Sequence, residues 1–535
     1  MKWWQDKIVY QIYPKSFYDS NNDGIGDIPG ITAKLDYLKD LGVDILWLTP
    51  CFLSPMKDNG YDVSDYRAIN PMFGTMEDME ALIEEANKRG MYIMLDIVAN
   101  HTSDQHEWFK QALEGKDNPY RDYYIFKDEP LPAIDSVFGG SAWEYEPNSK
   151  QYYLHQFAVG QPDLNTANPK VRQEIVDIIN FWIDKGVKGF RFDVIHLIGK
   201  EVDKGIFGYG PRLHEYVREM NEASFGKRDV VTVGEAWGDL SNAIDFTDPS
   251  RHELDMVFQF ETTTLSWGEN PLGKIAYHKP DMDRFKGVFA KYQEGLNEKG
   301  WNSLFLENHD SGRCVDVFGD VNYRYESATA LATAVYLQKG TPFIYQGQEI
   351  GLTNTKMDLA DYDDVEIFGL HRSLVETGLV SEKEFLEGVY KNGRDNARIP
   401  IPWDDSANGG FNAGAKTWIK VHPDYASINV KGEIENPDSV YHFYKKLIAL
   451  RKGSLKGVFV EGDFRLIYGE IKGLFAYSRK REEETVYVMA NLTSERKCVP
   501  LLAPVRQVLL ANRKKEHRGE TVLDLEPYEA LVFTL

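Results

Sequence analysis

Residues Gly189–His196 read GFRFDVIH, an apolar run in which two charged residues, Arg191 and Asp193, occupy alternate positions. Side chains alternate across a β-strand, so these two project to the same face of one strand. Seven other runs of similar character lie at Lys7–Pro14, Asp44–Pro50, Met91–His101, Val230–Trp237, Met256–Phe260, Asn302–Asp310 and Pro342–Gly351. Near-continuous apolar character is typical of parallel strands that are buried on both faces. The eight runs therefore predict a parallel β-sheet.

Helical patterns that end at glycine separate several of these runs. They span Ile31–Gly42, Met76–Gly90, Val171–Gly186, Met282–Gly300 and Tyr323–Gly340. Strand and helix alternating around eight strands favour an α/β fold of the (β/α)8 TIM-barrel type over an open sheet.

Two long interruptions and a change of pattern near the end suggest further domains. We expect a discontinuous barrel of residues 1–101 and 170–454, and an inserted domain of residues 102–169 after the third strand. A second excursion, from Thr353 to about Pro423, follows the eighth strand. Short alternating segments near the C-terminus, such as TVYVMANL, predict a sandwich-like antiparallel β domain at residues 455–535.

The composition restricts the class of partner. With 61 basic and 83 acidic residues among 535, the formal net charge is −22. A negative field of this size repels nucleic acid and anionic membranes, and it suits an enzyme with a small neutral substrate. Three distant cysteines have no metal-ligand spacing, and no stretch approaches 18 apolar residues. The N-terminus lacks the apolar core of a signal peptide, so we expect a cytoplasmic monomer or weak homo-oligomer.

Chemically active side chains gather at the ends of four predicted strands, where barrel enzymes carry their catalytic groups. They are Asp96, Asn100 and His101 on the third run, Arg191 and Asp193 on the fourth, Glu235 on the fifth, and Glu307, His309 and Asp310 on the seventh. A single strand-end aspartate is usually a turn former or a helix cap. Four strand ends equipped in this way indicate an active site instead.

Two carboxyl groups that face each other across a substrate can cleave a glycosidic bond. Arg191 is expected to keep Asp193 ionised, as a nucleophile requires. Glu235 lies in an apolar stretch, VGEAW, where burial is expected to raise its pKa, as an acid/base requires. The sequence gives no distance between the two carboxyl groups, so retention and inversion of configuration both remain open from spacing alone.

A second pattern, DSNNDGIGD at Asp19–Asp27, places oxygen-bearing side chains at alternate positions with a glycine at the sharp turn. It matches the first half of a calcium-binding loop, although Gly30 stands where the loop's bidentate glutamate is expected. This pattern predicts one structural Ca²⁺ ion away from the chemistry. The alternative is a solvated Asn/Asp/Gly turn.

Ten segments in order along the chain carry a family resemblance: QIYPKSF, DGIGD, DNGYDVSDY, DIVANH, QPDLN, GFRFDVI, VGEAW, ENHD, GTPFIYQGQEIG and GRDNAR. The sequence resembles the α-amylase superfamily (glycoside hydrolase family 13), and within it the oligo-1,6-glucosidase and dextran glucosidase group. The resemblance covers essentially the whole chain. It implies that residues 102–169 form the family's domain B, which walls the substrate pocket.

The resemblance also implies roles for individual residues in a retaining double displacement. Asp193 would be the nucleophile, Glu235 the acid/base, and Asp310 a third carboxylate that binds sugar hydroxyls. The sugar at the cleavage site would be held by His101, Arg191 and His309, with Tyr61 stacked on it, and its non-reducing end by Asp58 and Arg394. The Ca²⁺ ligands would be Asp19, Asn21, Asp23, the Ile25 carbonyl group and Asp27. No organic cofactor is implied.

Linkage preference rests on fewer residues. Val194 follows the nucleophile, as in relatives that cleave α-1,6 bonds, and the resemblance places Glu366 and Trp237 beside the leaving sugar. The sequence departs from the group at Ile399, Pro402 and Glu307, and the segment Thr262–Pro280, which includes Lys274, is divergent.

The expected activity is exo-acting hydrolysis of α-1,6-glucosidic bonds in isomaltose, panose and isomalto-oligosaccharides. Two enzyme alternatives remain: a trehalose-6-phosphate hydrolase, and an α-glucosidase of broader specificity for α-1,4 bonds or sucrose. A non-catalytic barrel of the kind associated with transporters would be expected to lack the catalytic pair, and this chain keeps both Asp193 and Glu235.

Overall fold

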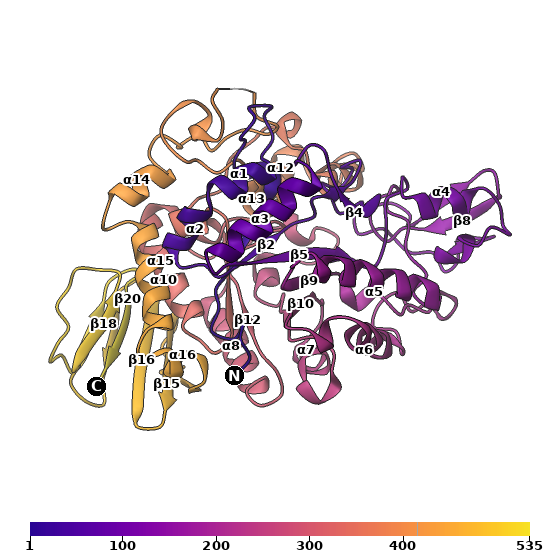
Figure 1. Ribbon diagram of the computed structural model, residues 1–535. Helices are drawn as coiled ribbons and strands as arrows, with labels where there is room; N and C mark the ends of the chain where they lie inside the picture. Colours follow the sequence, from indigo (N-terminus) through magenta and orange to yellow (C-terminus); the bar gives the residue numbers. More distant parts are fainter. Residues whose placement is uncertain (415) are drawn as a thin grey trace.

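The computed structural model describes residues 1–414 and 416–535, and its centre is a parallel barrel (Figure 1). Its eight strands are β1 (Val9–Ile12), β2 (Ile45–Leu48), β5 (Tyr92–Val98), β9 (Gly189–Asp193), β10 (Val231–Glu235), β11 (Met256–Phe258), β12 (Ser303–Leu304) and β13 (Thr341–Tyr345). The strand order is β11-β10-β9-β5-β2-β1-β13-β12, and a parallel bridge between Val257 and Asn302 joins the two ends of the sheet. All eight predicted strands are confirmed, and so is the barrel.

Helices surround the barrel on the outside. They include α1 (Ile28–Ala33), α2 (Leu35–Leu41), α3 (Met76–Lys88), α5 (Pro169–Asp184), α6 (Leu213–Ala223), α7 (Leu240–Thr247), α8 (Met282–Gly295), α9 (Cys314–Val317), α10 (Arg324–Tyr336) and α15 (Val440–Lys452). The helix predicted at Ile31–Gly42 is two helices, because the backbone turns at Lys34 (φ −105°, ψ 8°). Gly42, in the left-handed region (φ 102°), ends the second helix as predicted.

Between β5 and α5 the chain leaves the barrel, and we call residues 102–168 the inserted segment. It contains α4 (Glu107–Leu113) and an antiparallel sheet of β6 (Phe126–Lys127), β8 (Gln151–Leu154) and β7 (Trp143–Glu146). Figure 1 shows it projecting to the right of the barrel, in purple. A short ladder of β3 (Phe52–Leu53) and β4 (Asp65–Ile69) lies between it and the barrel.

A second excursion follows β13. It contains α11 (Val365–Leu370), α12 (Glu382–Asn392) and α13 (Asp395–Arg398), and the short helix α14 (Val430–Glu435) follows it. It has a hydrophobic cluster of its own, to which Ile275, from the divergent segment after β11, contributes. This cluster therefore ties the excursion to the neighbouring rim of the barrel.

Antiparallel strands end the chain, as predicted. Five form one sheet in the order β14 (Asp463–Ile467), β15 (Leu474–Arg481), β16 (Glu484–Asn491), β20 (Ala530–Thr534), β18 (Gln507–Ala511), and β17 (Lys497–Pro500) pairs with β19 (Val522–Leu525). We call them the C-terminal sheets. They follow the short helix α16 (Lys456–Val460) and lie beside α10 and α15.

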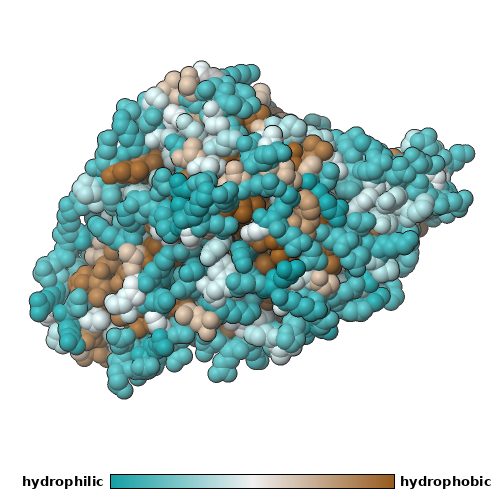
Figure 2. All heavy atoms as spheres, in the orientation of Figure 1, coloured by the Kyte–Doolittle hydropathy of each residue, from teal (hydrophilic) through white to brown (hydrophobic). Residues whose placement is uncertain are grey.

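Helix α10 separates the barrel from the C-terminal sheets, and ten consecutive residues of it, Ser327–Tyr336, are buried. Figure 2 shows a largely hydrophilic surface on the visible face, with apolar residues in smaller patches. Within the described residues, no helix is both long enough and apolar enough to cross a membrane.

Candidate active site

Arg191 gathers three carboxyl groups at one end of the barrel. Its Nη1 lies 2.8 Å from Asp96 Oδ1 and 2.7 Å from Asp193 Oδ1, and its Nη2 donates to Glu235 Oε2. Strand register explains part of this arrangement, because Asp96 on β5 pairs directly with Arg191 on β9. Asp193 is 6% and Glu235 is 8% exposed, so neither carboxyl group is turned into bulk solvent.

The charge state of this cluster differs from the prediction. Burial raises the pKa of Asp193 well above its usual range, although Arg191 opposes the shift; the charge of Glu235 and a hydrogen bond with its carboxyl group raise it further. Burial also raises the pKa of Asp96 to about 6. The prediction that Arg191 keeps Asp193 ionised is therefore wrong for the free site. Three buried carboxyl groups share one guanidinium, and the cluster retains a proton.

Two neighbours orient the carboxyl group of Glu235. Trp237 donates its indole N–H to Oε1 at 2.9 Å, and the Val194 backbone N–H lies 3.4 Å from Oε2. The Trp237 ring is itself stacked on Phe260, with centroids 4.3 Å apart. Val194 has φ 36°, a conformation rare for a β-branched residue, so the turn after β9 is strained where it meets Glu235.

A chain of hydrogen bonds connects β1 to the same cluster. Gln11 Nε2 lies 2.8 Å from His309 Nδ1, and His309 Nε2 lies 2.6 Å from the Tyr61 hydroxyl group. Tyr61 in turn donates to Asp96 Oδ2 at 3.0 Å. The rings of Tyr61 and His309 are parallel within 7° and 5.3 Å apart. Burial lowers the pKa of His309 to about 3, so the ring is neutral and rigidly held.

Asp310, unlike Asp193, is surrounded by positive charge. Its Oδ1 lies 2.8 Å from Arg398 and 3.4 Å from Arg394, and its Oδ2 lies 3.2 Å from His309 Nε2. Burial alone would raise its pKa, but the guanidinium groups of Arg394 and Arg398 oppose burial, and the pKa lies well below its usual range. Asp310 is therefore a permanent negative charge beside the cluster.

Arg394 and Asp58 lie together, as expected, but the pair belongs to a larger network. Arg394 Nη2 is 3.4 Å from Asp58 Oδ1 and also pairs with Asp364, while its Nε lies 3.3 Å from Glu366. Burial raises the pKa of Asp58 to about 7, although Arg394 lowers it. Asp364 is the ionised carboxylate of this network. Burial would raise its pKa, but Arg394 outweighs burial and lowers the pKa to about 2.

His101 is connected to Asp58 by Gln161 of the inserted segment. Gln161 Nε2 lies 3.0 Å from Asp58 Oδ2 and 3.2 Å from His101 Nε2, and Asn100 contacts the other ring nitrogen of His101 at 3.1 Å. Burial lowers the pKa of His101 to about 4, so this ring is neutral as well.

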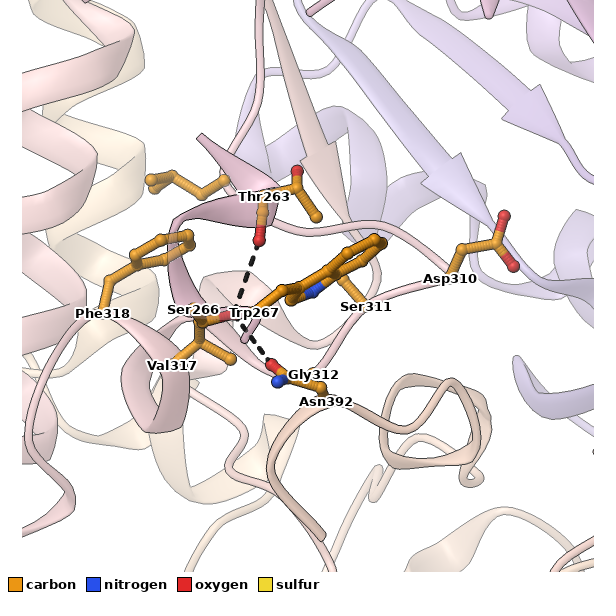
Figure 3. A pocket seen from close by; sticks show the side chains of 10 residues that line it. Thr263, Ser266, Trp267, Asp310, Ser311, Gly312, Val317, Phe318 and Asn392 are labelled. Carbon is orange, nitrogen blue, oxygen red and sulfur yellow. Dashed lines mark hydrogen bonds between the residues drawn. The ribbon is translucent and has the colours of Figure 1, made fainter. Parts of the chain in front are cut away.

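The divergent segment after β11 also reaches the site. Lys274 Nζ lies 2.6 Å from Glu366 Oε2. A basic residue of this divergent segment therefore lies beside Glu366, the residue expected near the leaving sugar. Nearby, Trp267 and Ser266 of this segment line a narrow cavity with Asp310, Ser311 and Asn392 (Figure 3). Ser266 donates to Asn392 Oδ1 at 3.0 Å across one wall of this cavity.

The sequence predictions for the pocket can now be compared with its geometry. The structure brings together the twelve catalytic and substrate-binding candidates: Asp58, Tyr61, His101, Arg191, Asp193, Val194, Glu235, Trp237, His309, Asp310, Glu366 and Arg394. Their catalytic roles remain predictions.

Comparison with known proteins identifies the family. The model of the α-amylase catalytic domain matches residues 11–460, and that of the α-amylase SusG C-terminal domain matches residues 474–532. The chain belongs to the α-amylase family. It is 48% identical to a glucan 1,6-alpha-glucosidase of Streptococcus pneumoniae and 46% identical to an oligo-1,6-glucosidase of Parageobacillus thermoglucosidasius, over 100% of this chain and 99% of each relative. It is thus a glycoside hydrolase of the oligo-1,6-glucosidase group.

Solved structures of the α-amylase family superpose over nearly their full length. A trehalulose synthase from Pseudomonas mesoacidophila MX-45 gives a TM-score of 0.95 at 42% identity. A trehalose-6-phosphate hydrolase of Bacillus licheniformis gives 0.94 at 40% identity. Each covers 100% of this chain and is itself 99% covered. The fold and family are therefore shared by enzymes of different specificity.

Three residues of this α-amylase-family site had no predicted role, namely Gln161, Asp364 and Arg398, and Asp96 was predicted at the active-site end of its strand without an individual role. Asp96 lies two positions before Val98 on a strand already known to end at the site. Arg398 lies one helical turn after Arg394 in the motif GRDNAR, and Asp364 lies two positions before the predicted residue Glu366, so both positions were within reach of the sequence analysis. Gln161 is the first residue of the segment QPDLN, one of the ten that carry the family resemblance, so a signal existed there as well.

The predicted calcium loop is folded as a series of Asx-type turns. Asp19 accepts from the backbone of Asn22 and Gly24, at 2.7 and 2.8 Å, and Asp23 accepts from Ile25 at 2.9 Å. Among the residues that the structure describes, no group of three or more His, Cys, Asp or Glu side chains is arranged for a metal ion.

The remaining ligand candidates of the loop bond locally as well. Asn21 accepts from Asp23 at 2.9 Å, while Asp27 caps α1 through Gly30. Asp19 and Asp27 are both only 2% exposed, and no basic side chain pairs with either among the described residues. Both carboxyl groups accept hydrogen bonds, Asp19 from Asn412 as well and Asp27 from Ser20, but no cation balances their charge, so they fit a site for a hard cation.

Proposed function

We propose that this enzyme is an exo-acting, retaining α-glucosidase that releases glucose from the α-1,6-linked non-reducing ends of isomaltose, panose and isomalto-oligosaccharides. One observation carries the mechanism: Asp193 and Glu235, on adjacent strands, bond to two nitrogen atoms of one guanidinium. Retaining glycosidases need closely spaced carboxyl groups, whereas inverting enzymes separate them by about 6.5 Å or more to admit a water molecule.

The proposed first step breaks the bond between the anomeric carbon and the leaving oxygen. Asp193 attacks the anomeric carbon and forms a glycosyl ester, while Glu235 gives its proton to the leaving oxygen. The proton that the buried cluster retains must lie on Glu235 at that moment.

In the proposed second step, Glu235 takes a proton from water and the resulting hydroxide displaces Asp193 from the anomeric carbon. The product is glucose with its original anomeric configuration, and Glu235 regains its proton. Arg191 stabilises the departing Asp193 carboxylate through its 2.7 Å contact. Asp310, held ionised by two arginines, is proposed to bind sugar hydroxyl groups and favour the positive charge that develops on the ring.

The exo-action is proposed from the pair of Asp58 and Arg394. Asp58 and Arg394 present a carboxyl group and a guanidinium to the same space, and both are less than 10% exposed. Such a pair suits the vicinal hydroxyl groups of one terminal glucose.

The preference for α-1,6 bonds is supported by the two relatives named above, whose names specify this linkage. Val194, Trp237, Glu366 and Lys274 are proposed to contact the leaving sugar.

Initial rates on isomaltose, panose, maltose, sucrose and trehalose 6-phosphate, measured side by side, test the proposal. Isomaltose and panose should be hydrolysed fastest, and proton NMR should detect α-glucose as the first product. Faster release of glucose 6-phosphate from trehalose 6-phosphate would instead favour the activity named for the B. licheniformis neighbour. Release of β-glucose would contradict retention.

We also propose one structural Ca²⁺ ion in the loop Asp19–Asp27. Asp19, Asn21, Asp23, the Ile25 carbonyl group and Asp27 would hold it, and the ion would brace the loop against α1 rather than take part in the chemistry.

A further inference from the structure

We propose that Gly369 is a positioning residue: because it lacks a side chain, the inserted segment packs directly onto α11 and closes the sugar pocket. This inference rests on the proposed function and extends it to a residue that touches neither the substrate nor the catalytic cluster.

The contact joins two backbones. A Cβ atom added to Gly369 would lie 2.0 Å from the carbonyl oxygen of Phe138 and 3.1 Å from its carbonyl carbon. A Cβ added to Gly139 would in turn lie 3.4 Å from the Gly369 carbonyl oxygen. Interiors are too closely packed to absorb a Cβ atom only 2.0 Å from a backbone oxygen, so any larger residue at position 369 must displace the facing loop.

That loop, Ser136–Gly140, is the tip of a hairpin in the inserted segment. Ser136 N donates to Gly140 O at 2.8 Å, and Val137 N donates to Gln156 O at 2.9 Å. Ser136 Oγ also donates to Phe157 O at 2.7 Å. These bonds tie the tip to Gln156 and Phe157, which follow β8, so a push on Phe138 also moves Phe157.

The two phenylalanines cover the pocket from the side of the inserted segment. The Phe138 ring lies 5.1 Å from the Arg394 guanidinium carbon, and its centroid is 5.7 Å from that of Phe157. The Phe157 ring lies 5.0 Å from His101. Displacing the tip would therefore expose Arg394 and His101 to water and weaken every polar contact that they make to a sugar.

Helix α11 also carries Glu366, which contacts Arg394 and Lys274. The Gly369 contact thus fixes the inserted segment relative to the helix that supplies the other side of the pocket. A change at this contact alters pocket closure without removing any group that reacts.

The test compares Gly369→Ala with wild type on isomaltose. We expect KM to rise about tenfold with kcat within about twofold, because lost closure weakens ground-state and transition-state binding alike. The inhibition constant of glucose should rise in parallel. Gly287→Ala is the matched control, since an added Cβ on this α8 glycine meets no atom within 4 Å.

A double-mutant cycle separates positioning from general destabilisation. Phe138→Ala removes the ring through which Gly369 is proposed to act, so Gly369→Ala should raise KM much less in that background. Equal effects of Gly369→Ala in both backgrounds would overturn the inference.

Should Gly369→Ala fold poorly, hydrogen exchange of the wild-type enzyme provides the answer. Glucose should protect Ser136–Gly140 and Val365–Leu370 together, and protection of either alone would contradict the inference. If the wild-type enzyme releases no glucose from isomaltose, the proposed function is contradicted. If the wild-type enzyme is active and Gly369→Ala leaves KM unchanged, this inference alone is contradicted.

Discussion

Asp193 and Glu235 are joined through the guanidinium of Arg191, which bonds to one carboxyl group with each of two nitrogen atoms. The two side chains come from adjacent parallel strands, β9 and β10. Their proximity follows from strand order, and their different environments follow from what else touches each carboxyl group.

The first prediction concerns this pair. Asp193→Asn should lower kcat on isomaltose by about 10³-fold or more. A neutral amide is a poor nucleophile towards the anomeric carbon, and it does not balance the positive charge of Arg191. The melting temperature should stay at or above that of wild type, since the variant removes one of three carboxyl groups that share a single cation. Thermal unfolding followed by circular dichroism checks the fold. Surviving activity in a protein free of wild-type contamination would contradict the assignment.

Asp58 predicts a pH-dependent difference in stability. Its pKa of about 7 in the folded enzyme lies above the value near 3.9 expected for an unfolded chain. The folded state therefore binds more protons between these values, and the stability contributed by Asp58 falls as pH rises from about 4 to about 7.

Asp58→Asn mimics the protonated side chain at every pH. Its melting temperature should exceed that of wild type at pH 8, and the difference should shrink toward pH 4. KM for isomaltose should rise at the same time, because the variant loses the carboxylate proposed to bind a sugar hydroxyl. A stability difference that is constant across pH would show that Asp58 does not titrate in this range.

Arg394 balances a buried carboxylate as well as binding substrate. Arg394→Ala should lower the free energy of unfolding by about 3 kcal/mol, since it leaves the Asp364 charge buried without its main partner. Arg394→Ala combined with Asp364→Asn should recover part of this loss, as measured by urea unfolding. Equal stability of the single and double variants would contradict the pairing.

The calcium proposal predicts a ligand-dependent melting temperature. Excess Ca²⁺ should raise the melting temperature of chelator-treated enzyme, because an ion that binds only the folded state stabilises it. Asp23→Ala should remove most of the increase while keeping the α1 cap, which Asp27 provides. Magnesium serves as the control ion, and an identical response to both ions would argue against a specific site.

The sequence predicted the barrel well because parallel strands buried on both faces leave a plain apolar signal, as in Gly189–His196. It predicted the members of the site well because motifs identify residue types at strand ends. It failed on the charge of Asp193, since the competition between burial and one guanidinium depends on how many carboxyl groups share that cation. It also gave no role to Gln161 or Arg398, whose contacts exist only after distant loops have folded together.

Helix α10 has further significance for the architecture. Barrel residues cover one flank, while the other is covered by β16 and β20, and Asn512 donates to Thr329 Oγ1 at 2.9 Å. Removing the C-terminal sheets would expose an apolar face of α10 to solvent. A chain truncated after α15 should therefore aggregate rather than remain a folded, active barrel. Calorimetry of the whole enzyme should then record one melting transition, with barrel and C-terminal sheets lost together.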